Sequence, residues 1–173
     1  MPTPSIFCIR SCLGAIMLLA VSCTQEFTIS LNNQPVFDPG GRLFDGQLVD
    51  PDLQGCVNFA VQQQGIQSPA MLTVLSCANS EVRDLGNISQ LAQLRFLDLG
   101  NNNISNITPL EDLTQLGGLN LMNNAISDIA VLLNIPTLAS VSLVGNNEIP
   151  CNQLQLLQVK LGDNLDSPLS CRN

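Results

Sequence analysis

Apolar residues recur with a period of 22 positions through the second half of the chain. Each copy reads Leu-x-x-Leu-x-x-Leu-x-Leu, or a close variant of it, and an asparagine follows three positions after the last of these residues. A fixed period of this length predicts a solenoid, in which each copy stacks on the one before it. Five columns stay in phase through three copies: Leu91, Leu113 and Ile135; Leu94, Leu116 and Leu138; Leu97, Leu119 and Val141; Leu99, Leu121 and Leu143; Asn102, Asn124 and Asn146.

The centre of each copy alternates apolar and polar residues, as in Leu97-Asp98-Leu99, which predicts a short strand whose middle residue faces outward. One copy cannot bury its apolar edge alone, so we expect a parallel sheet over a shared core. A fourth, degenerate copy begins at Pro69, with Cys77 replacing the second strand leucine and Ser80 the asparagine. Because the asparagine column repeats in step with the core leucines, we expect an internal ladder that satisfies backbone groups at a turn rather than a polar binding row.

The return side of each copy is predicted to form a short helical turn. Thr108 stands where a hydroxyl N-cap would, with Pro109 at the first helical position and Glu111 closing a capping box. A further in-phase column favours Asx-type turns over a metal site: Asp84, Asn106 and Asp128.

Two amphipathic helices flank the repeats, and we expect them to seal the open ends of the core. Asp50 caps the first, with Pro51 at its first position and Gly65 just past its end. The second begins at Cys151 and stops at Gly162. Their apolar faces are Leu53, Cys56, Val57, Ala60 and Val61 in the first, and Leu154, Leu157 and Leu161 in the second.

The pattern LxxLxxLxLxxNxI resembles a leucine-rich repeat of the 22-residue kind found in bacterial internalins. The resemblance is strong from Pro69 to Asn146 and looser over 50–171, where the caps and cysteines are similar to those of small bacterial leucine-rich repeat lipoproteins. It implies an α/β fold: a short solenoid with a parallel β-sheet on its concave face, short helical turns on the return side, and helical caps at both ends. In this family the outward strand positions bind partners. Here they are Val74, Ser76, Ala78, Phe96, Asp98, Gly100, Gly118, Asn120, Met122, Ser140, Ser142 and Val144, with Arg95 beside them.

The N-terminus has the features of an export signal. Arg10 precedes a short apolar run that ends at Val21, which suits a signal-peptide core and is too short to span a bilayer. The residues before Cys23 resemble a bacterial lipobox, which implies lipidation of that cysteine, and Thr24 implies sorting to the outer membrane of a Gram-negative bacterium. Ordinary signal cleavage, with plain secretion, is the alternative.

The chain therefore divides into five predicted parts. These are a lipoprotein signal peptide (1–22), a tether with a possible small hairpin (23–49), an N-terminal helical cap (50–68), about four repeats (69–149) and a disulfide-closed cap (150–173).

The chain has seven cysteines, of which two leave with the signal and Cys23 is left over from an even set of four. Cys77 lies on the first predicted strand and Cys151 beyond the fourth, so about three strand spacings of roughly 4.8 Å separate their layers. A disulfide requires Cα atoms within about 7 Å of each other. We therefore expect Cys56–Cys77 and Cys151–Cys171, and no metal site, because no two of these cysteines have CxxC spacing.

The composition argues against several function classes. A formal charge of −8 leaves no basic stripe for nucleic acid. The absence of histidine removes His-based catalysis. The paired carboxylates fit helix capping and solvation better than acid–base chemistry, so we expect no enzyme and no cofactor; the pairs are Asp50/Asp52, Glu111/Asp112 and Asp163/Asp166.

The sequence thus predicts a monomeric, non-catalytic envelope lipoprotein whose concave face binds an unknown protein or peptide. Seven residues would carry the contact: Phe96, Met122 and Val144 as apolar surface, Arg95, Asp98 and Asn120 for orientation, and Ser142 beside them. The face is otherwise small and neutral and offers few of the residues that dominate interfaces. A structural spacer without a ligand and a secreted internalin-like host-contact protein are the alternatives.

Overall fold

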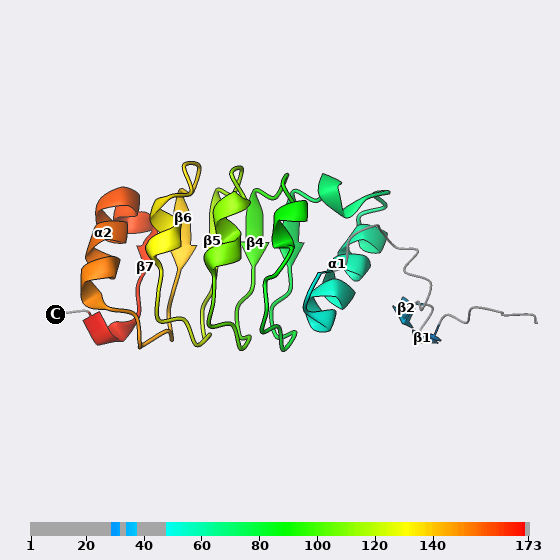
Figure 1. Cartoon of the computed structure of the whole chain (residues 1–173), viewed down its shortest axis with the longest axis horizontal. Coiled ribbons are helices and arrows are strands. Elements are labelled where there is room, and N and C mark those ends of the chain that lie inside the picture. Colours follow the sequence, from blue (N-terminus) through cyan, green and yellow to red (C-terminus); the bar gives the residue numbers. More distant parts are fainter. Residues whose placement is uncertain (1–28, 32–33, 38–47, 172–173) are drawn as a thin grey trace, which may run out of the picture.

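The computed structural model describes residues 29–31, 34–37 and 48–171. Five parallel strands form one sheet along the solenoid, in chain order from β3 to β7 (Figure 1). The strands are β3 Val74–Ser76, β4 Phe96–Asp98, β5 Gly118–Asn120, β6 Ser140–Ser142 and β7 Leu165–Asp166. Leu97 pairs with Leu75 on one side and Leu119 on the other, so residues at the same position of successive copies pair between neighbouring strands. The predicted leucine-rich repeat fold is confirmed.

The strand β7 was not predicted from the sequence. Leu165 pairs with Val141, which lies 24 positions before it rather than 22. The helix α2 replaces the short turn of an ordinary copy at this point, and the longer connection takes Leu165 out of the periodic pattern. The predicted C-terminal cap therefore also contributes a fifth layer to the sheet.

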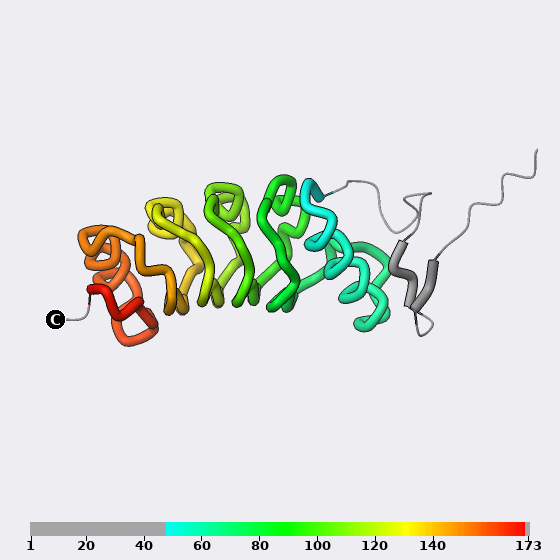
Figure 2. Tube along the Cα trace, turned by 90° about the horizontal axis from the view of Figure 1, so that it is seen from below, coloured from blue at the N-terminus to red at the C-terminus, as the bar shows by residue number. Residues whose placement is uncertain are grey.

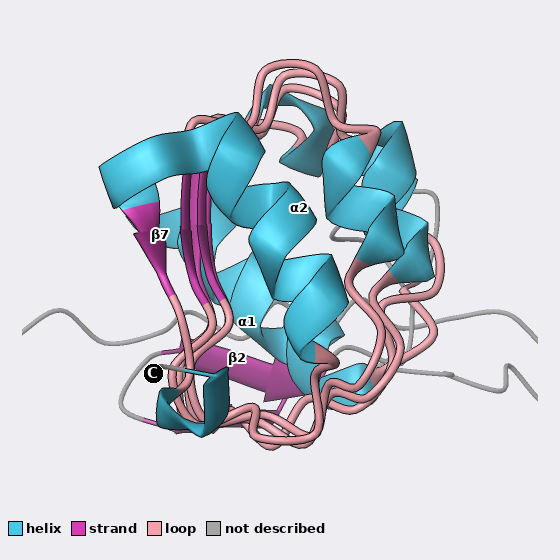
Figure 3. Ribbon diagram, turned by 90° about the vertical axis from the view of Figure 1, so that its left-hand side faces the viewer, coloured by secondary structure: helices cyan, strands magenta, loops and turns pink. Residues whose placement is uncertain are grey.

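Short 3₁₀ helices lie opposite the sheet, and the successive coils superpose along the axis (Figures 2 and 3). They are η1 Pro69–Met71, η2 Ile88–Gln90, η3 Thr108–Asp112 and η4 Ala130–Leu133. The predicted Asx column is confirmed: an Oδ1 atom of Asp84, Asn106 or Asp128 accepts the N–H two residues later in each copy.

The prediction that Thr108 is an N-cap was wrong. The N-cap position of η3 is Ile107, and Thr108 is already the first helical residue. Oδ1 of Asn106 accepts the backbone N–H of Thr108 at 3.0 Å. Asn106 thus forms an Asx turn just before η3, and η3 begins without a side-chain cap.

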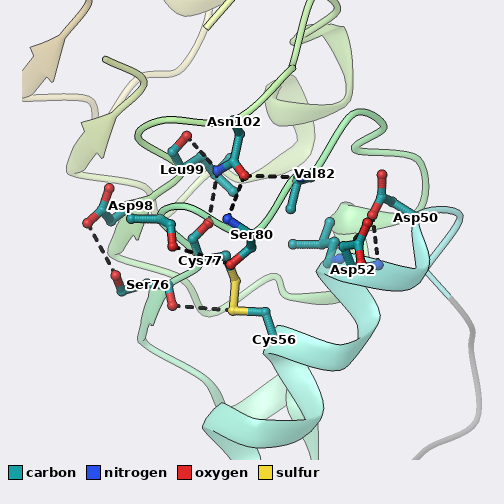
Figure 4. Close-up of a disulfide and its surroundings, with 12 residues drawn as sticks. Asp50, Asp52, Cys56, Ser76, Cys77, Ser80, Val82, Asp98, Leu99 and Asn102 are labelled. Carbon is teal, nitrogen blue, oxygen red and sulfur yellow. Dashed lines mark hydrogen bonds between the residues drawn. A yellow bond between two sulfur atoms is a disulfide. The ribbon is translucent and has the colours of Figure 1, made fainter. Parts of the chain in front are cut away.

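The asparagine ladder is internal, as predicted. Oδ1 of Asn102 accepts N–H groups from Ser80 and Val82, and its Nδ2 donates to carbonyls of Cys77 and Leu99 (Figure 4). At Asn124 and Asn146, Nδ2 likewise donates to carbonyls of its own copy and the preceding one, and Oδ1 accepts one N–H group of the preceding copy. Each amide thus joins its own turn to the preceding copy, which is a structural role.

Helices close both ends of the core. The helix α1 spans Pro51–Gln63, and α2 spans Cys151–Leu161. Their buried residues are Leu53, Val57 and Val61 in α1, and Leu154, Leu157 and Leu161 in α2. Beyond α2 the chain forms η5 (Gly162–Asn164), β7 and η6 (Leu169–Cys171).

Both expected disulfides are present. The bond between Cys56 and Cys77 joins α1 to the end of β3 (Figure 4), and the bond between Cys151 and Cys171 joins the start of α2 to η6. Each cap is thus covalently closed on its own side of the repeats.

The strands β1 (Ile29–Leu31) and β2 (Gln34–Phe37) pair antiparallel, in the segment where the sequence predicts a hairpin. The predicted signal peptide, the lipobox and Cys23 lie outside the described residues. Within the part that the structure describes, no helix is long and apolar enough to cross a membrane.

Candidate functional site

The strands present one continuous outward surface, which we call the sheet face. Alternation along each strand buries the middle residue, such as Leu97, and leaves its neighbours outside. Parallel pairing in register then aligns outward residues into three rows. The first row is Val74, Phe96, Gly118 and Ser140; the second is Ser76, Asp98, Asn120, Ser142 and Asp166; the third is Ala78, Gly100, Met122 and Val144.

The second row is polar and ordered by hydrogen bonds between strands. Oδ2 of Asp98 accepts the Ser76 hydroxyl at 3.2 Å, and Oδ1 accepts Nδ2 of Asn120 at 2.8 Å. Oδ1 of Asp98 also accepts the backbone N–H of Gly100 at 3.0 Å. On the far side, the Ser142 hydroxyl donates to Oδ2 of Asp166 at 3.5 Å. The side chains of this row are therefore held in place before any partner arrives.

The first row contains the largest exposed apolar side chains of the sheet face. Val74 is 50% exposed and Phe96 is 44% exposed. A Cβ atom placed on Gly118 would lie 2.8 Å from Cδ2 of Phe96, so the aromatic ring occupies the space that a side chain would need there. Gly118 thereby leaves room for the Phe96 ring beside the neighbouring strand.

The third row shows a similar arrangement. A Cβ atom on Gly100 would lie 3.1 Å from Cγ of Met122 and 3.1 Å from Nδ2 of Asn120. Gly100 thus leaves space for a methionine on one side of the polar row, as Gly118 does for a phenylalanine on the other. The result is a polar strip between two apolar flanks.

The structure brings four of the predicted contact residues close together: Phe96, Asp98, Asn120 and Met122 lie on or beside the adjacent strands β4 and β5. Ser142 and Val144 are half-buried on the next strand and beyond it. Arg95 is exposed at the start of β4, where its backbone carbonyl accepts the N–H groups of Gly117 and Gly118.

Two features of the site were not selected from the sequence. Val74 was recognised as outward-facing but not chosen as a contact residue, although it is more exposed than Phe96. Asp166 was missed because β7 was missed. The pair Leu165-Asp166 repeats the apolar-then-acidic order of Leu97-Asp98, which is the one signal that could have placed it.

Among the paired carboxylates, Asp50 is held by backbone donors. The Asp50 side chain accepts four backbone N–H groups, from Asp52, Leu53, Arg83 and Asp84. Burial opposes its ionisation, but these hydrogen bonds outweigh burial and lower its pKa. Among the residues described, no group of three or more His, Cys, Asp or Glu side chains could hold a metal ion.

Comparison with known proteins identifies the repeats. Residues 71–112 match a family model described as Leucine Rich repeats (2 copies). An internalin from Listeria monocytogenes, InlF, has a similar structure, with 26% identity and a TM-score of 0.61 over 71% of this chain and 37% of that chain. Internalin C2 of the same bacterium matches with 23% identity and a TM-score of 0.50, over 58% of this chain and 47% of that chain.

The chain spans less than half the length of either of these two structures. No curated protein sequence matches it significantly. The comparisons therefore agree with the structure on a leucine-rich repeat solenoid that is similar to internalins.

Proposed function

We propose that this chain is a non-catalytic module of the bacterial cell envelope that binds a protein or peptide through its sheet face, the concave face of the family. The observation that carries the proposal is the arrangement of that face, where a strip of pre-ordered polar groups lies between exposed apolar side chains. Leucine-rich repeat solenoids use extended surfaces of this kind for binding. The molecule would act as a monomer.

The contact residues would divide their roles by chemistry. Phe96, Met122 and Val144 would supply apolar contact area, and Phe96 is the only aromatic side chain of the sheet face as we define it. Asp98 and Asn120 would orient the partner through hydrogen bonds, because their positions are already set by neighbouring groups. Arg95 would contact the partner at the margin of the sheet face, and Ser142 would extend the polar strip.

Export and lipidation complete the proposal. Two disulfides in a small domain fit a compartment outside the cytosol. The lipobox-like residues before Cys23 and the odd cysteine count favour a lipid anchor, in the outer membrane of a Gram-negative bacterium, over plain secretion. Intact mass of the mature protein tests this, because an unmodified Cys23 would remove the anchor from the proposal.

The second candidate is a structural spacer without a specific ligand. It is favoured by the small residues that make up much of the sheet face, such as Ala78, Gly100, Gly118 and Ser140. The two functions differ in one measurable respect, because only a binding module holds a defined partner against the sheet.

The test is proximity crosslinking in the native envelope. A photo-crosslinking amino acid replaces Phe96 on the sheet face, and the matched control replaces exposed Glu111 on η3, on the opposite side of the solenoid. A discrete adduct at position 96 alone supports the binding module and identifies its partner. No adduct at either position, from a folded and lipidated chain, would favour the spacer.

A double variant, Phe96→Ala with Asp98→Ala, tests the assigned residues. We expect it to lose most of the partner capture, while full capture would show that the contact lies elsewhere. Release of free protein into the culture medium would favour the secreted, host-contact alternative.

A further inference from the structure

We infer that Asp98 is the recognition point for a basic side chain of the partner, a lysine or an arginine whose aliphatic stem packs against Phe96 or Met122. This inference rests on the proposed function and names the chemistry of the partner. It begins from the charge of the carboxylate. All three groups that donate to Asp98 are neutral: the Ser76 hydroxyl, the Asn120 amide and the Gly100 N–H.

The cations of the described segment do not neutralise Asp98. Lys160 donates to three backbone carbonyls at the end of η4. Arg83 and Arg95, the other two cations in this part of the chain, form no ion pair with Asp98. The sheet face therefore presents a negative charge at Asp98 that is held in position and has no ion-pair partner within residues 48–171.

The carboxylate retains capacity for another donor. An ionised carboxylate offers about four acceptor positions. Two of the three donors to Asp98 share Oδ1, and a single hydroxyl contacts Oδ2 at 3.2 Å. An incoming ammonium or guanidinium group can thus add a hydrogen bond at Oδ2. Because the carboxylate is already held, little conformational entropy is lost when that bond forms.

The flanking side chains suit the rest of a basic residue. Phe96 lies two positions from Asp98 on the same face of β4, a separation of about 7 Å along a strand. The stems of lysine and arginine pack readily on apolar surfaces while the charge reaches a polar group. Met122 offers the same kind of surface on the other side of the polar row.

Other partners fit this position less well. An apolar segment that covered Asp98 would bury an unpaired charge, which is strongly unfavourable. An acidic segment would be repelled both by Asp98 and by the formal charge of −8 on the chain. Calcium needs six to eight oxygen ligands, and the described residues form no cluster of acidic side chains that could hold a metal ion.

The variant Asp98→Asn removes the negative charge while it preserves the hydrogen bonds around the side chain. The asparagine Oδ1 can still accept from Asn120 and Gly100, and its Nδ2 can donate to the Ser76 hydroxyl, which then reverses its role. The side-chain size is unchanged, so the sheet face should keep its shape. The matched control is Asp112→Asn, which removes the same charge from an exposed position at the end of η3.

The experiment is a selection from a displayed library of random linear peptides against the full chain, its Asp98→Asn variant and its Asp112→Asn control. With the unaltered chain and the control, we expect enrichment of peptides in which lysine or arginine neighbours an apolar residue. We expect their affinity for the Asp98→Asn chain to fall by about three- to tenfold, the range typical of a partly exposed ion pair. Thermal unfolding of all three proteins confirms that they are equally folded.

Two outcomes would overturn the inference. Basic peptides that bind Asp98→Asn as well as the unaltered chain would show that net charge attracts them, and enrichment of peptides without basic residues would show that the sheet face selects for something else. In the second case, loss of peptide binding by the Phe96→Ala variant would still support the sheet face as a binding surface. The proposed function itself fails only when neither the selection nor the crosslinker at position 96 detects a partner on this face.

Discussion

The side chain of Asp50 offers the sharpest test of how the N-terminal cap is held. It is 6% exposed and accepts N–H groups from two separate places in the chain: the first turn of α1, and the residues Arg83 and Asp84. One oxygen caps the helix, and the other binds the first repeat. Asp50 therefore joins the cap to the solenoid in addition to the disulfide between Cys56 and Cys77.

Replacing Asp50 by alanine should lower the free energy of unfolding by about 2–3 kcal/mol. Loss of an N-cap costs about 1 kcal/mol. Loss of charged hydrogen bonds to Arg83 and Asp84 adds about 1.5 kcal/mol, less than the full cost of buried groups because water can reach this turn. Urea-induced unfolding with the disulfides intact measures the change. Asp52→Ala is the matched control, since its exposed side chain accepts none of these hydrogen bonds.

The same carboxylate should make stability depend on pH. Its pKa is lowered in the folded chain relative to the ordinary value of 3.8. The stabilisation is therefore fully present above that value and is lost as the pH falls through the lower, folded value. The difference in unfolding free energy between the natural chain and Asp50→Ala should shrink in strong acid. An Asp50→Ala chain as stable as the control at neutral pH, or a difference that grows in acid, would refute this account.

Three further predictions follow from particular contacts. Asn102→Ala leaves two N–H groups of a turn and the carbonyls of Cys77 and Leu99 without this partner, so it should lower the free energy of unfolding by about 3 kcal/mol, measured by thermal unfolding. Lys160→Met keeps the apolar stem but removes the donor to three carbonyls, and should cost about 1–3 kcal/mol and speed amide exchange in α2. Gly145→Ala should destabilise by about 1–3 kcal/mol, because φ is +86° and the new methyl group would collide with Asn123. The contrasting change Gly55→Ala, in open space within α1, should stabilise by about 0.5–1 kcal/mol, and an equal effect of both changes would contradict the strain argument.

Periodicity predicted the features that every copy repeats. The leucine columns are buried and the asparagines bond as a ladder, because each stacked copy imposes the same environment on the same position. Strand spacing then limited the disulfides to one pairing, and the structure contains it. These inferences needed only the repeat length and the geometry of a parallel sheet.

Features that do not repeat were harder to predict. Whether Thr108 caps the turn or lies within it depends on the backbone angles of the folded turn, which place Ile107 at the N-cap position. The link from Asp50 to Arg83 and Asp84 depends on where α1 packs against the first copy, which no local pattern specifies.

The sheet face combines both kinds of feature, which explains why the rows of residues could be predicted from the repeat while the hydrogen bonds within them could not. The period put Ser76, Asp98, Asn120 and Ser142 in one row, but these residues differ from copy to copy, so no repeat pattern states which of them bond. The structure shows that Asp98 accepts hydrogen bonds from both neighbouring strands. The Ser142 hydroxyl instead donates to Asp166 on β7, the strand that was not predicted from the sequence. The row is thus interrupted between Asn120 and Ser142, where no side-chain hydrogen bond joins them among the described contacts. A partner whose basic side chain binds Asp98 would therefore contact the N-terminal part of the sheet, beside Phe96 and Val74. Substitutions should first be made there.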